Sequence, residues 1–437
     1  MRLPEIIKKI LRLRYPCIRL WEKTVSRLRY PSAYLWRFLL FRTTIIAISG
    51  STGKTTTKEL LAAILSSKYL TAKTSGTWNA YRFGGVAGTI LSVRPWHRFA
   101  VIETAIEAPG DMKHLVKILR PDIVVMLGVK LCHSNTFKNI ENIVKEKSEL
   151  VRTLGAKKRA ILNGDDPNVA AMRALGSFET CLFGTGEDAE FRASHINSQW
   201  PERLELQVQH RGETQKVHTA FIGTHWVDSI LAALATGVSC GVPLADAVQA
   251  IEAIQPFWAR MQPVTLPNGA TIIRDEWNGS ITTFQTAFSA MERAIAERKF
   301  IVVSDFSDSS LSPRDRARRL GRQAPQVADW AIFVGERSHY ASRAALNAGM
   351  LPERVHSFFT VAEAALFLKD ELGPGDLVLL KGRTSDHLSR IFLAQLDHVT
   401  CTLETCPRQY LCDRCTQLGF EWDSKFDGFM APPHILV

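Results

Sequence analysis

The sequence predicts a mixed α/β protein with mostly parallel sheets, and three observations support this fold class. Apolar runs of strand length alternate with amphipathic helical patterns from residue 43 to about residue 396, as expected for parallel strands joined by crossover helices. The apolar run Ile45–Ile48 leads through a glycine-rich turn directly into a helical pattern. Prolines at positions 256, 263 and 267 separate two such blocks near residue 260. We therefore predict a P-loop central domain followed by a second, Rossmann-like α/β domain.

The predicted strands follow in order along both blocks. They are expected at residues 45–48, 99–103, 122–127, 159–162, 271–274, 299–304, 330–334 and 376–381. The short alternating segments within residues 186–222 are typical of an antiparallel insert. The expected organisation is a basic aromatic arm (1–42), the central domain (43–260), a C-terminal α/β domain (261–396) and a Cys-rich tail (397–437).

The charge of the chain is concentrated at one end. The 437 residues carry a net charge of +11, which by itself would suggest a nucleic-acid partner. Residues 1–42 hold eleven Lys and Arg against two Glu, which is +9 of that total. The remainder is near neutral and offers no continuing basic track, so no nucleic-acid partner is expected. No apolar run is long enough to span a membrane, and no cleaved signal peptide is recognisable. The cytosol is the expected compartment.

The N-terminal arm contains a tandem repeat. Residues Arg12–Trp21 recur as Arg27–Trp36, fifteen residues later, and each copy is a short basic aromatic segment with one Pro. Arg combined with Tyr, Trp and Leu is typical of segments at an anionic membrane surface. The alternative is a pair of helices that pack their aromatic faces on the protein while the charges stay solvated. Both interpretations stay open, with nucleic acid as a weaker third. A peripheral location at the inner face of a membrane would follow from the first.

The strongest motif is the glycine-rich turn after the first strand. It reads Gly50-Ser51-Thr52-Gly53-Lys54-Thr55-Thr56. Backbone N–H groups at a helix N-terminus favour anionic oxygens, and Lys54 adds a point charge. The hydroxyl of Thr55 can reach a Mg²⁺ ion. The motif predicts a nucleoside triphosphate site, against the alternative of a tight strand-to-helix turn without a ligand.

The order of motifs along the chain resembles the Mur ligase family, and within it the muramoyl-tripeptide–D-alanyl-D-alanine (MurF-like) ligases. The resemblance covers roughly residues 43–396. It rests on the loop Gly50–Thr56, on Glu103 at a strand end, and on Lys147 fourteen residues after His133. The resemblance implies an ATP-dependent ligase of peptidoglycan-like biosynthesis. Such an enzyme joins a carboxylate to an amine of an amino acid or peptide through an acyl phosphate.

The resemblance also implies roles for residues of the central domain. Lys54 would hold the β- and γ-phosphates of ATP, and Thr55 a Mg²⁺ ion. Glu103 would bind Mg²⁺ near the γ-phosphate, and His133 a second Mg²⁺. Lys147 matches the lysine that is carbamylated in many members, where it becomes a carboxylate-like metal ligand.

The resemblance also implies that other residues contact the nucleotide or belong to the part that closes over it. Asn79 matches the Asn of a family Gly-Asn segment. Arg260, Asp275 and Asn278 match family positions near the nucleotide, Asp275 at the ribose. Further matches in the second block, which closes on the ATP domain in this family, are Asp305 and Lys381-Gly382-Arg383.

Two departures from the family pattern bear on the substrate. The family motif Gly-x-His-Asn-x-x-Asn reads Gly223 to Ser229 here, with Trp226 and Ser229 in place of the two Asn. Trp226 could stack on adenine instead, or the nucleotide site could be altered. The family's domain for the UDP end of its sugar nucleotide has no counterpart among the 42 residues before the first strand. We therefore expect that domain to be missing and a lipid-linked or membrane-proximal carboxylate to be the acid substrate.

The tail holds four closely spaced cysteines, Cys401, Cys406, Cys412 and Cys415. Their spacing is typical of a structural Zn²⁺ site, because the tail is too short and polar to order itself by burying a core. An iron–sulfur cluster and free or redox-active thiols are the alternatives.

The sequence thus predicts an ATP-dependent, Mg²⁺-requiring carboxylate–amine ligase. A catalytically inert ATP-binding homologue that acts as a membrane-associated assembly factor is the alternative from another class of protein. A general P-loop ATPase is the third, and it leaves the His133-to-Lys147 spacing unexplained. The acid and the amine are not identified by the sequence.

Overall fold

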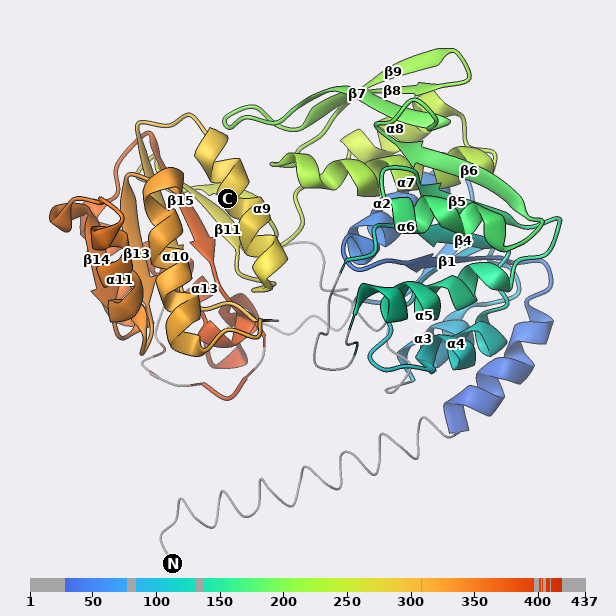
Figure 1. Cartoon of the computed structure of the whole chain (residues 1–437), viewed down its shortest axis with the longest axis horizontal. Coiled ribbons are helices and arrows are strands. Elements are labelled where there is room, and N and C mark those ends of the chain that lie inside the picture. The colour runs from blue at the N-terminus through green and yellow to red at the C-terminus, as the bar shows by residue number, and fades with distance from the viewer. Residues whose placement is uncertain are drawn as a thin grey trace, which may run out of the picture. The chain divides into compact units, whose positions relative to one another are not determined.

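The computed structural model describes residues 28–76, 84–130, 137, 139–307, 309–396, 401, 403, 406–408 and 410–418. The chain forms two compact units, each described here by itself (Figure 1). The first consists of residues 1–194, 207–217 and 226–252. The second consists of residues 195–206, 218–225 and 253–437.

The first sheet has nine strands in the order β2-β3-β1-β4-β5-β6-β7-β8-β9. Their bounds are β1 Thr44–Ser49, β2 Thr71–Lys73, β3 Phe99–Glu103, β4 Ile123–Met126, β5 Arg159–Asn163, β6 Glu179–Gly184, β7 Phe191–Asn197, β8 Glu205–His210 and β9 Glu213–His218. From β2 to β7 every neighbouring pair is parallel. The glycine-rich turn follows the central strand β1, whose neighbours are β3 and β4.

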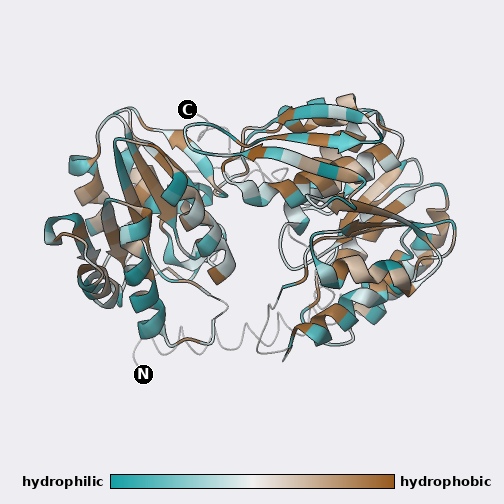
Figure 2. Cartoon of the chain, turned by 45° about the horizontal axis from the view of Figure 1, so that its top comes forward, coloured by the Kyte–Doolittle hydropathy of each residue, from teal (hydrophilic) through white to brown (hydrophobic). Residues whose placement is uncertain are grey.

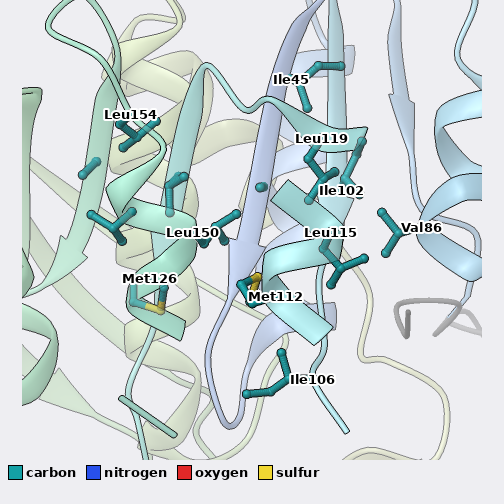
Figure 3. Packing of buried hydrophobic residues seen from close by; sticks show 14 of the residues in the cluster. Ile45, Val86, Ile102, Ile106, Met112, Leu115, Leu119, Met126, Leu150 and Leu154 are labelled. Atoms are coloured by element: carbon teal, nitrogen blue, oxygen red, sulfur yellow. The ribbon is translucent and has the colours of Figure 1, made fainter. Parts of the chain in front are cut away.

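Helices cover both faces of the parallel part of this sheet (Figure 1). Their bounds are α2 Lys54–Ser66, α3 Gly85–Ser92, α4 Asp111–Leu119, α5 Ile140–Arg152, α6 Pro167–Ala170, α7 Val227–Ser239 and α8 Leu244–Glu252. Alternate residues of β1 point to opposite faces, and Ile45 and Ala47 join a core with α3, α4 and α5. Figure 3 shows this core, in which Leu115 of α4 and Leu150 of α5 pack over the strands. Helix α2 contacts α7 and α8 instead.

The predicted antiparallel insert is correct for one hairpin and wrong at its junction with the sheet. Strands β8 and β9 are joined by Arg211 and Gly212, both with positive φ, and a two-residue connection of this kind makes an antiparallel hairpin. Strand β7, however, pairs in parallel with β6, with Phe191 opposite Phe183. The alternation of polar and apolar residues indicates a half-exposed strand but does not fix the direction of its partner.

The second sheet has six strands in the order β10-β11-β15-β12-β13-β14. Their bounds are β10 Gln262–Thr265, β11 Thr271–Asp275, β12 Arg298–Val303, β13 Trp330–Val334, β14 Val355–Phe358 and β15 Asp376–Lys381. Only the edge pair β10 and β11 is antiparallel; the other four pairs are parallel. In both sheets the central parallel strands are largely hydrophobic (Figure 2), as expected for parallel strands covered on two faces.

The helices of the second unit are α9 Ile281–Arg293, α10 Pro313–Val327, α11 Ser338–Asn347, α12 Val361–Glu371 and α13 Ser389–Gln395. Helices α12 and α13 close a core over Phe300, Ile332 and Val378. Helix α12 begins with a capping box, in which Thr360 and Glu363 satisfy each other's backbone N–H groups. The predicted fold class, a mixed α/β protein with two mostly parallel sheets, is confirmed.

The end of the arm forms a helix over residues 28–39. Ala33 is buried in the first core, and the Trp36 indole donates to the Val93 carbonyl oxygen at 2.8 Å. The Arg37 guanidinium donates to the Leu119 carbonyl oxygen at 2.8 Å. This part of the arm therefore packs on the protein, but with Arg37 buried rather than solvated and with Phe38 and Leu39 exposed. The first copy of the repeat lies outside the described residues, and within the described part of the chain no helix has the length and apolarity to cross a membrane.

Candidate functional site

The glycine-rich turn depends on glycine at two positions. Gly50 has φ 154° and Gly53 has φ 80°, values that side chains other than hydrogen disfavour. A Cβ on Gly50 would lie 2.7 Å from the Leu127 Cβ, and one on Gly53 would lie 2.8 Å from the Ser229 hydroxyl. The backbone therefore approaches its neighbours too closely for any other residue, and α2 begins directly after it at Lys54.

The turn is held from the segment that follows β4. The Ser51 N–H donates to the Gly128 carbonyl oxygen at 2.8 Å. The Ser51 hydroxyl donates to the Lys130 carbonyl oxygen at 2.9 Å and accepts from the Lys130 N–H at 2.8 Å. The Asp166 carboxylate, after β5, accepts from the Val129 N–H at 2.6 Å. Loops after three neighbouring strands thus fix one another at the carboxyl edge of the sheet, where such sheets bind ligands.

Two lysines reach the same carbonyl oxygen of this turn. Lys54 Nζ donates to the Gly50 oxygen at 3.0 Å and to the Ser51 oxygen at 3.2 Å. Lys147 Nζ, from the middle of α5, donates to the Gly50 oxygen at 2.9 Å, and its side chain is buried. Together with the N-terminus of α2 they place two positive charges where a phosphate would bind. The structure thus brings Lys147 to the loop although 97 residues separate it from Gly50.

Thr55 and Glu103 form the oxygen-rich part of the site. The Thr55 hydroxyl donates to Glu103 Oε1 at 3.0 Å. Glu103 is the last residue of β3, is buried, and its N–H donates to the Thr74 hydroxyl at 3.1 Å. A hydroxyl and a carboxylate held together beside a phosphate site are hard ligands of the kind that Mg²⁺ prefers. These two residues therefore fit the predicted Mg²⁺.

One residue near the site carries no motif signal. Lys58 of α2 is fully buried, and its Nζ donates to the carbonyl oxygens of Thr74 and Gly76 at 2.8 and 2.6 Å. It also pairs with Glu59 at 2.9 Å. Lys58 therefore fixes the chain that leads toward Asn79. A Lys on the inner face of an amphipathic helix is the only sequence signal that could have indicated this role.

Two predicted residues of the first unit cannot be placed. Asn79 and His133 lie outside the described residues. The predicted pairing of His133 with Lys147 through a second Mg²⁺ therefore stays a prediction, as does the carbamylation of Lys147.

The stacking of Trp226 on adenine stays a prediction. Trp226 is buried at the start of α7 rather than presented as an exposed ring. Ser229, on the first turn of α7, donates to the Gly53 carbonyl oxygen at 3.3 Å. The small side chain at 229 thus lets α7 approach the phosphate loop.

In the second unit the predicted residues Asp275 and Asn278 meet around Lys381. Lys381 Nζ pairs with Asp275 Oδ2 at 2.7 Å and donates to the Asn278 carbonyl oxygen at 2.5 Å. Asp275 Oδ1 also accepts from the Met261 N–H at 3.1 Å. Burial raises the pKa of Asp275, and the Lys381 charge opposes that shift. The adjacent Arg260 guanidinium lies 5.2 Å from the Trp277 ring centre, so this group forms one connected cluster.

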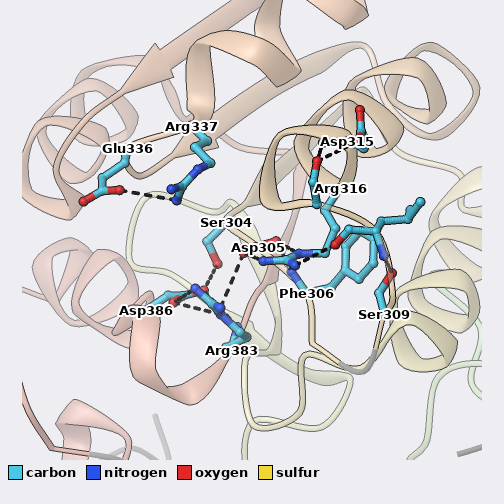
Figure 4. Close-up of polar contacts among 12 residues, drawn as sticks. Ser304, Asp305, Phe306, Ser309, Asp315, Arg316, Glu336, Arg337, Arg383 and Asp386 are labelled. Atoms are coloured by element: carbon cyan, nitrogen blue, oxygen red, sulfur yellow. Dashed lines mark hydrogen bonds and ion pairs between the residues drawn. The ribbon is translucent and has the colours of Figure 1, made fainter. Parts of the chain in front are cut away.

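Asp305 and Arg383 belong to a second network at the carboxyl ends of β12 and β15 (Figure 4). Arg316 of α10 holds Asp305 with two bonds, at 2.7 and 2.5 Å. Arg383 pairs with Asp305 at 3.4 Å and with Asp386 at 2.8 Å. Asp386 also accepts from the Ser304 hydroxyl at 2.6 Å. The half-exposed Arg383 is therefore oriented by two carboxylates at the edge where the parallel strands end.

The cysteines of the tail have protein neighbours rather than a common ligand geometry. Cys412 Sγ lies 3.4 Å from the His387 Nδ1, and Arg408 donates to Cys415 Sγ at 2.8 Å. Burial raises the pKa of Cys412 to about 11, which disfavours its thiolate. In the described part of the chain, no three His, Cys, Asp or Glu side chains are arranged to hold a metal ion. The predicted zinc is therefore not supported by the arrangement of these side chains.

The tail is instead fixed by a buried carboxylate. Asp413 Oδ2 accepts from Arg274 Nη1 at 2.8 Å and from the Trp258 indole at 2.7 Å. Arg274, Asp413 and Glu276 are buried, and Arg274 also pairs with Glu276. Arg274 immediately precedes Asp275 on β11. The tail segment is thus an integral part of the second unit.

The first unit is defined by a parallel sheet, a phosphate loop after its central strand, and lysines and a carboxylate at that loop. These features define a phosphate-loop nucleotide-binding protein of the α/β class. Comparison with protein families is more specific: the Mur ligase middle domain matches residues 48–237, and the Mur ligase glutamate ligase domain matches residues 259–384.

Related proteins agree with these family matches. The UDP-N-acetylmuramoyl-tripeptide–D-alanyl-D-alanine ligase of Bacillus subtilis is 25% identical over 351 residues, which are 80% of this chain and 75% of that protein. The ligase of the same name from Mycobacterium tuberculosis is 26% identical over 389 residues, with shares of 82% and 74%.

Solved structures show the same fold. A crystal structure of MurF from Acinetobacter baumannii matches with a TM-score of 0.77 and 26% identity, over 85% of this chain and 80% of that one. MurF ligase from Thermotoga maritima, in complex with ADP, matches with a TM-score of 0.70 and 23% identity, over 84% and 82%. The chain belongs to the Mur ligase family and is an enzyme of its ATP-dependent ligase class.

Proposed function

We propose that the protein joins the carboxylate of a peptide-bearing acid to the amine of an amino acid or short peptide. A carboxylate oxygen attacks the γ-phosphorus of ATP, and ADP leaves. The amine then attacks the carbonyl carbon of the acyl phosphate, phosphate leaves, and the amine loses a proton. The observation that carries this proposal is the joint placement of Lys54, Lys147, Thr55 and Glu103 around one phosphate loop.

Charge explains why these residues suit the first step. A carboxylate and a triphosphate are both anions, so the site must offset their repulsion. Lys54 supplies a cation at the Gly50 carbonyl oxygen, and Lys147 supplies a second one in its unmodified form. Carbamylated, Lys147 would instead be a ligand of Mg²⁺. Fixed charges aimed at the reacting group stabilise the charge of the transition state without reorganisation. Thr55 and Glu103 would hold Mg²⁺, which shields the phosphate oxygens when it is bound.

For the substrates we propose the pair that the relatives' names give, a muramoyl tripeptide as the acid and D-alanyl-D-alanine as the amine. A lipid-linked form of the acid is the alternative. The second unit supports an anionic ligand, because Arg383 is half-exposed at the carboxyl edge of its sheet and oriented by Asp305 and Asp386. We propose Arg260, Asp275 and Asn278 as nucleotide-side residues of this unit.

We further propose a cytosolic enzyme that associates peripherally with the membrane. Support comes from the helix at residues 28–39, whose outer side carries the exposed Leu35, Phe38 and Leu39. Zinc is not part of this proposal.

The test is phosphate release from ATP with and without each substrate. We expect release only when the acid and the amine are both present with Mg²⁺, and loss of release on chelation. Lys54→Met should lower the rate by about 100-fold, as for other removals of a group that stabilises transition-state charge. Lys113→Met, an exposed lysine of α4, is the matched control and should keep the wild-type rate.

Three outcomes would contradict the proposal. Phosphate release that needs neither acid nor amine would indicate a general ATPase. ATP binding without turnover across pools of acids and amines would indicate an inert homologue. A Lys54→Met variant with unchanged activity would place the chemistry elsewhere.

A further inference from the structure

The amino edge of the first sheet presents a surface that the proposed reaction does not use. Strands β1 to β5 are parallel neighbours, so they all begin at this edge. The phosphate loop follows the carboxyl end of β1 and lies at the opposite edge. The residues that precede these strands are therefore side by side, away from the nucleotide site.

Three large apolar side chains precede three of these strands, and all are strongly exposed. Phe41 lies before β1 with 78% of its surface exposed, Leu70 before β2 with 57%, and Trp96 before β3 with 69%. Backbone bonds hold their segments together: Arg98 N–H donates to the Leu70 oxygen at 2.8 Å, and Thr44 N–H to the Arg98 oxygen at 3.0 Å. We call Phe41, Arg42, Leu70, Trp96 and Arg98 the amino-edge rim.

Cations surround these apolar side chains. A cavity of about 720 Å³ at this edge is lined by Phe41, Arg42, Arg98 and Lys157, among others. Its two carboxylates already have partners, since Asp122 pairs with Arg37 and Lys158, and Glu179 with Arg159. Among the residues that the structure describes, no carboxylate pairs with Arg42, Arg98 or Lys157. The rim is thus both apolar and positively charged.

The helix at residues 28–39 extends this surface. It leads into Phe41 and Arg42, and its exposed side chains include Leu35, Phe38 and Leu39. Arg120 stacks on Phe38, with its guanidinium 4.1 Å from the ring centre. Aromatic and aliphatic side chains interleaved with arginines continue from the helix to the rim.

We infer that the amino-edge rim is the surface by which the protein docks on an anionic lipid membrane. Exposed Trp, Phe and Leu enter the headgroup region, while Arg and Lys bind lipid phosphates. Charge decides between the possible occupants. Residues 1–27 carry eight Lys and Arg against two Glu, so the arm would be repelled by a cationic rim. A second copy would present the same charge.

The inference adds an orientation to the proposed membrane location, and it rests on that location but not on ligase activity. With the amino edge on the membrane, the phosphate loop at the other edge of the sheet faces water. Nucleotide would then enter from the aqueous side without leaving the membrane-bound state.

The test is sedimentation of the full-length protein with vesicles, without ATP or substrates, so that failure of the ligase proposal cannot affect it. We expect binding to phosphatidylglycerol-containing vesicles and little binding to pure phosphatidylcholine. Arg42→Ser combined with Arg98→Ser should weaken binding about 30-fold, and Phe41→Ser with Trp96→Ser should also weaken it. The matched control, Phe359→Ser with Leu366→Ser, removes two apolar side chains of the second unit that are 60% and 68% exposed, and it should bind normally.

Hydrogen exchange on the bound protein would locate the contact. Residues 39–43 and 94–98 should gain protection from anionic vesicles, and residues 50–56 should not. Unchanged binding by both rim variants would overturn the inference, and so would equal binding to uncharged vesicles. A rim-dependent dimer without lipid would identify a second copy as the occupant instead. Unchanged melting temperatures of the variants would exclude unfolding as the cause.

Discussion

At the scale of single residues, two buried lysines hold loops of this protein in place. Lys58 fixes the chain at Thr74 and Gly76, and Lys381 holds the turn from Asp275 to Asn278. A buried ammonium is tolerated only where carbonyl oxygens and carboxylates replace its water. Each lysine therefore stays buried only while the backbone oxygens that it binds keep their positions.

His225 gives a prediction about pH. Burial, with a smaller contribution from the Lys381 charge, lowers the pKa of His225 to about 3. The unfolded chain would bind the proton near pH 6.5 and the native protein only near pH 3, so stability falls as pH decreases through this window. The expected slope is about 1.4 kcal/mol per pH unit below pH 6.5.

The measurement is unfolding by urea at pH 7.5 and pH 5.5 for the wild type and for His225→Asn. The variant should be less stable at pH 7.5 but should lose this contribution to the pH dependence. If both proteins lost the same free energy of unfolding between the two pH values, His225 would not be the group responsible.

At the scale of secondary-structure elements, the junction of β1 with α2 shows how closely elements approach. Gly53 and Gly110 precede α2 and α4 respectively, and both have a left-handed backbone. A Cβ on Gly110 would meet nothing within 4 Å, whereas one on Gly53 would meet the Ser229 hydroxyl at 2.8 Å. Alanine substitutions at the two positions therefore separate the cost of the left-handed backbone conformation, which both carry, from the cost of steric overlap, which only Gly53 carries.

Gly110→Ala should lower the free energy of unfolding by about 1 kcal/mol, the cost of a left-handed residue with a Cβ. Gly53→Ala should lower it further, and it should also weaken nucleotide binding because the loop must shift. Adding Ser229→Ala should recover part of the loss. Chemical denaturation and ADP titration measure the two effects. If both single variants lost the same free energy of unfolding, or if the double variant recovered none of it, the close contact of Gly53 with Ser229 of α7 would not be the cause.

A helix or strand could be predicted where the residues that cause it to form are close together in the sequence. The apolar run of β1, the glycines of the turn and the helical pattern of α2 all lie within about twenty residues of sequence. The contacts of Ser51 with Lys130 and of Asp166 with Val129 join loops far apart in the chain. No periodicity encodes such pairs, so they became visible only in the structure. Lys147 was placed through a family resemblance, and its bond to Gly50 could not be derived from spacing.

At the scale of the whole molecule, a buried ion pair joins the Cys-rich tail to the second unit. The spacing of cysteines in the tail predicted a metal, yet the tail is held in place by contacts that include the buried Arg274–Asp413 pair and the packing of Leu411 beside Trp258. A sequence pattern shows which residues could form a site but not which partners compete for them. Asp413, one of two acids among the cysteines, gave no sequence signal.

Asp413→Asn should lower the free energy of unfolding by about 2 to 3 kcal/mol, because it leaves part of the buried Arg274 charge uncompensated. It should also speed the reaction of Cys412 with a thiol reagent at pH 8, since this thiol is otherwise buried. Asp370→Asn, at an exposed position of α12, is the control. Thiol labelling at the wild-type rate in Asp413→Asn would show that the carboxylate does not hold the tail.

The Gly50 carbonyl oxygen connects two helices of the first unit. It has two lone pairs and accepts from lysines of two different helices, Lys54 of α2 and Lys147 of α5. A phosphate that draws Lys54 away leaves this acceptor to Lys147 alone. Linkage is reciprocal: if nucleotide binding strengthens the bond between Lys147 and Gly50 by some factor, formation of that bond raises nucleotide affinity by the same factor. A modification of the Lys147 amine that removes its bond to Gly50 is therefore expected to change the affinity of the loop for ATP.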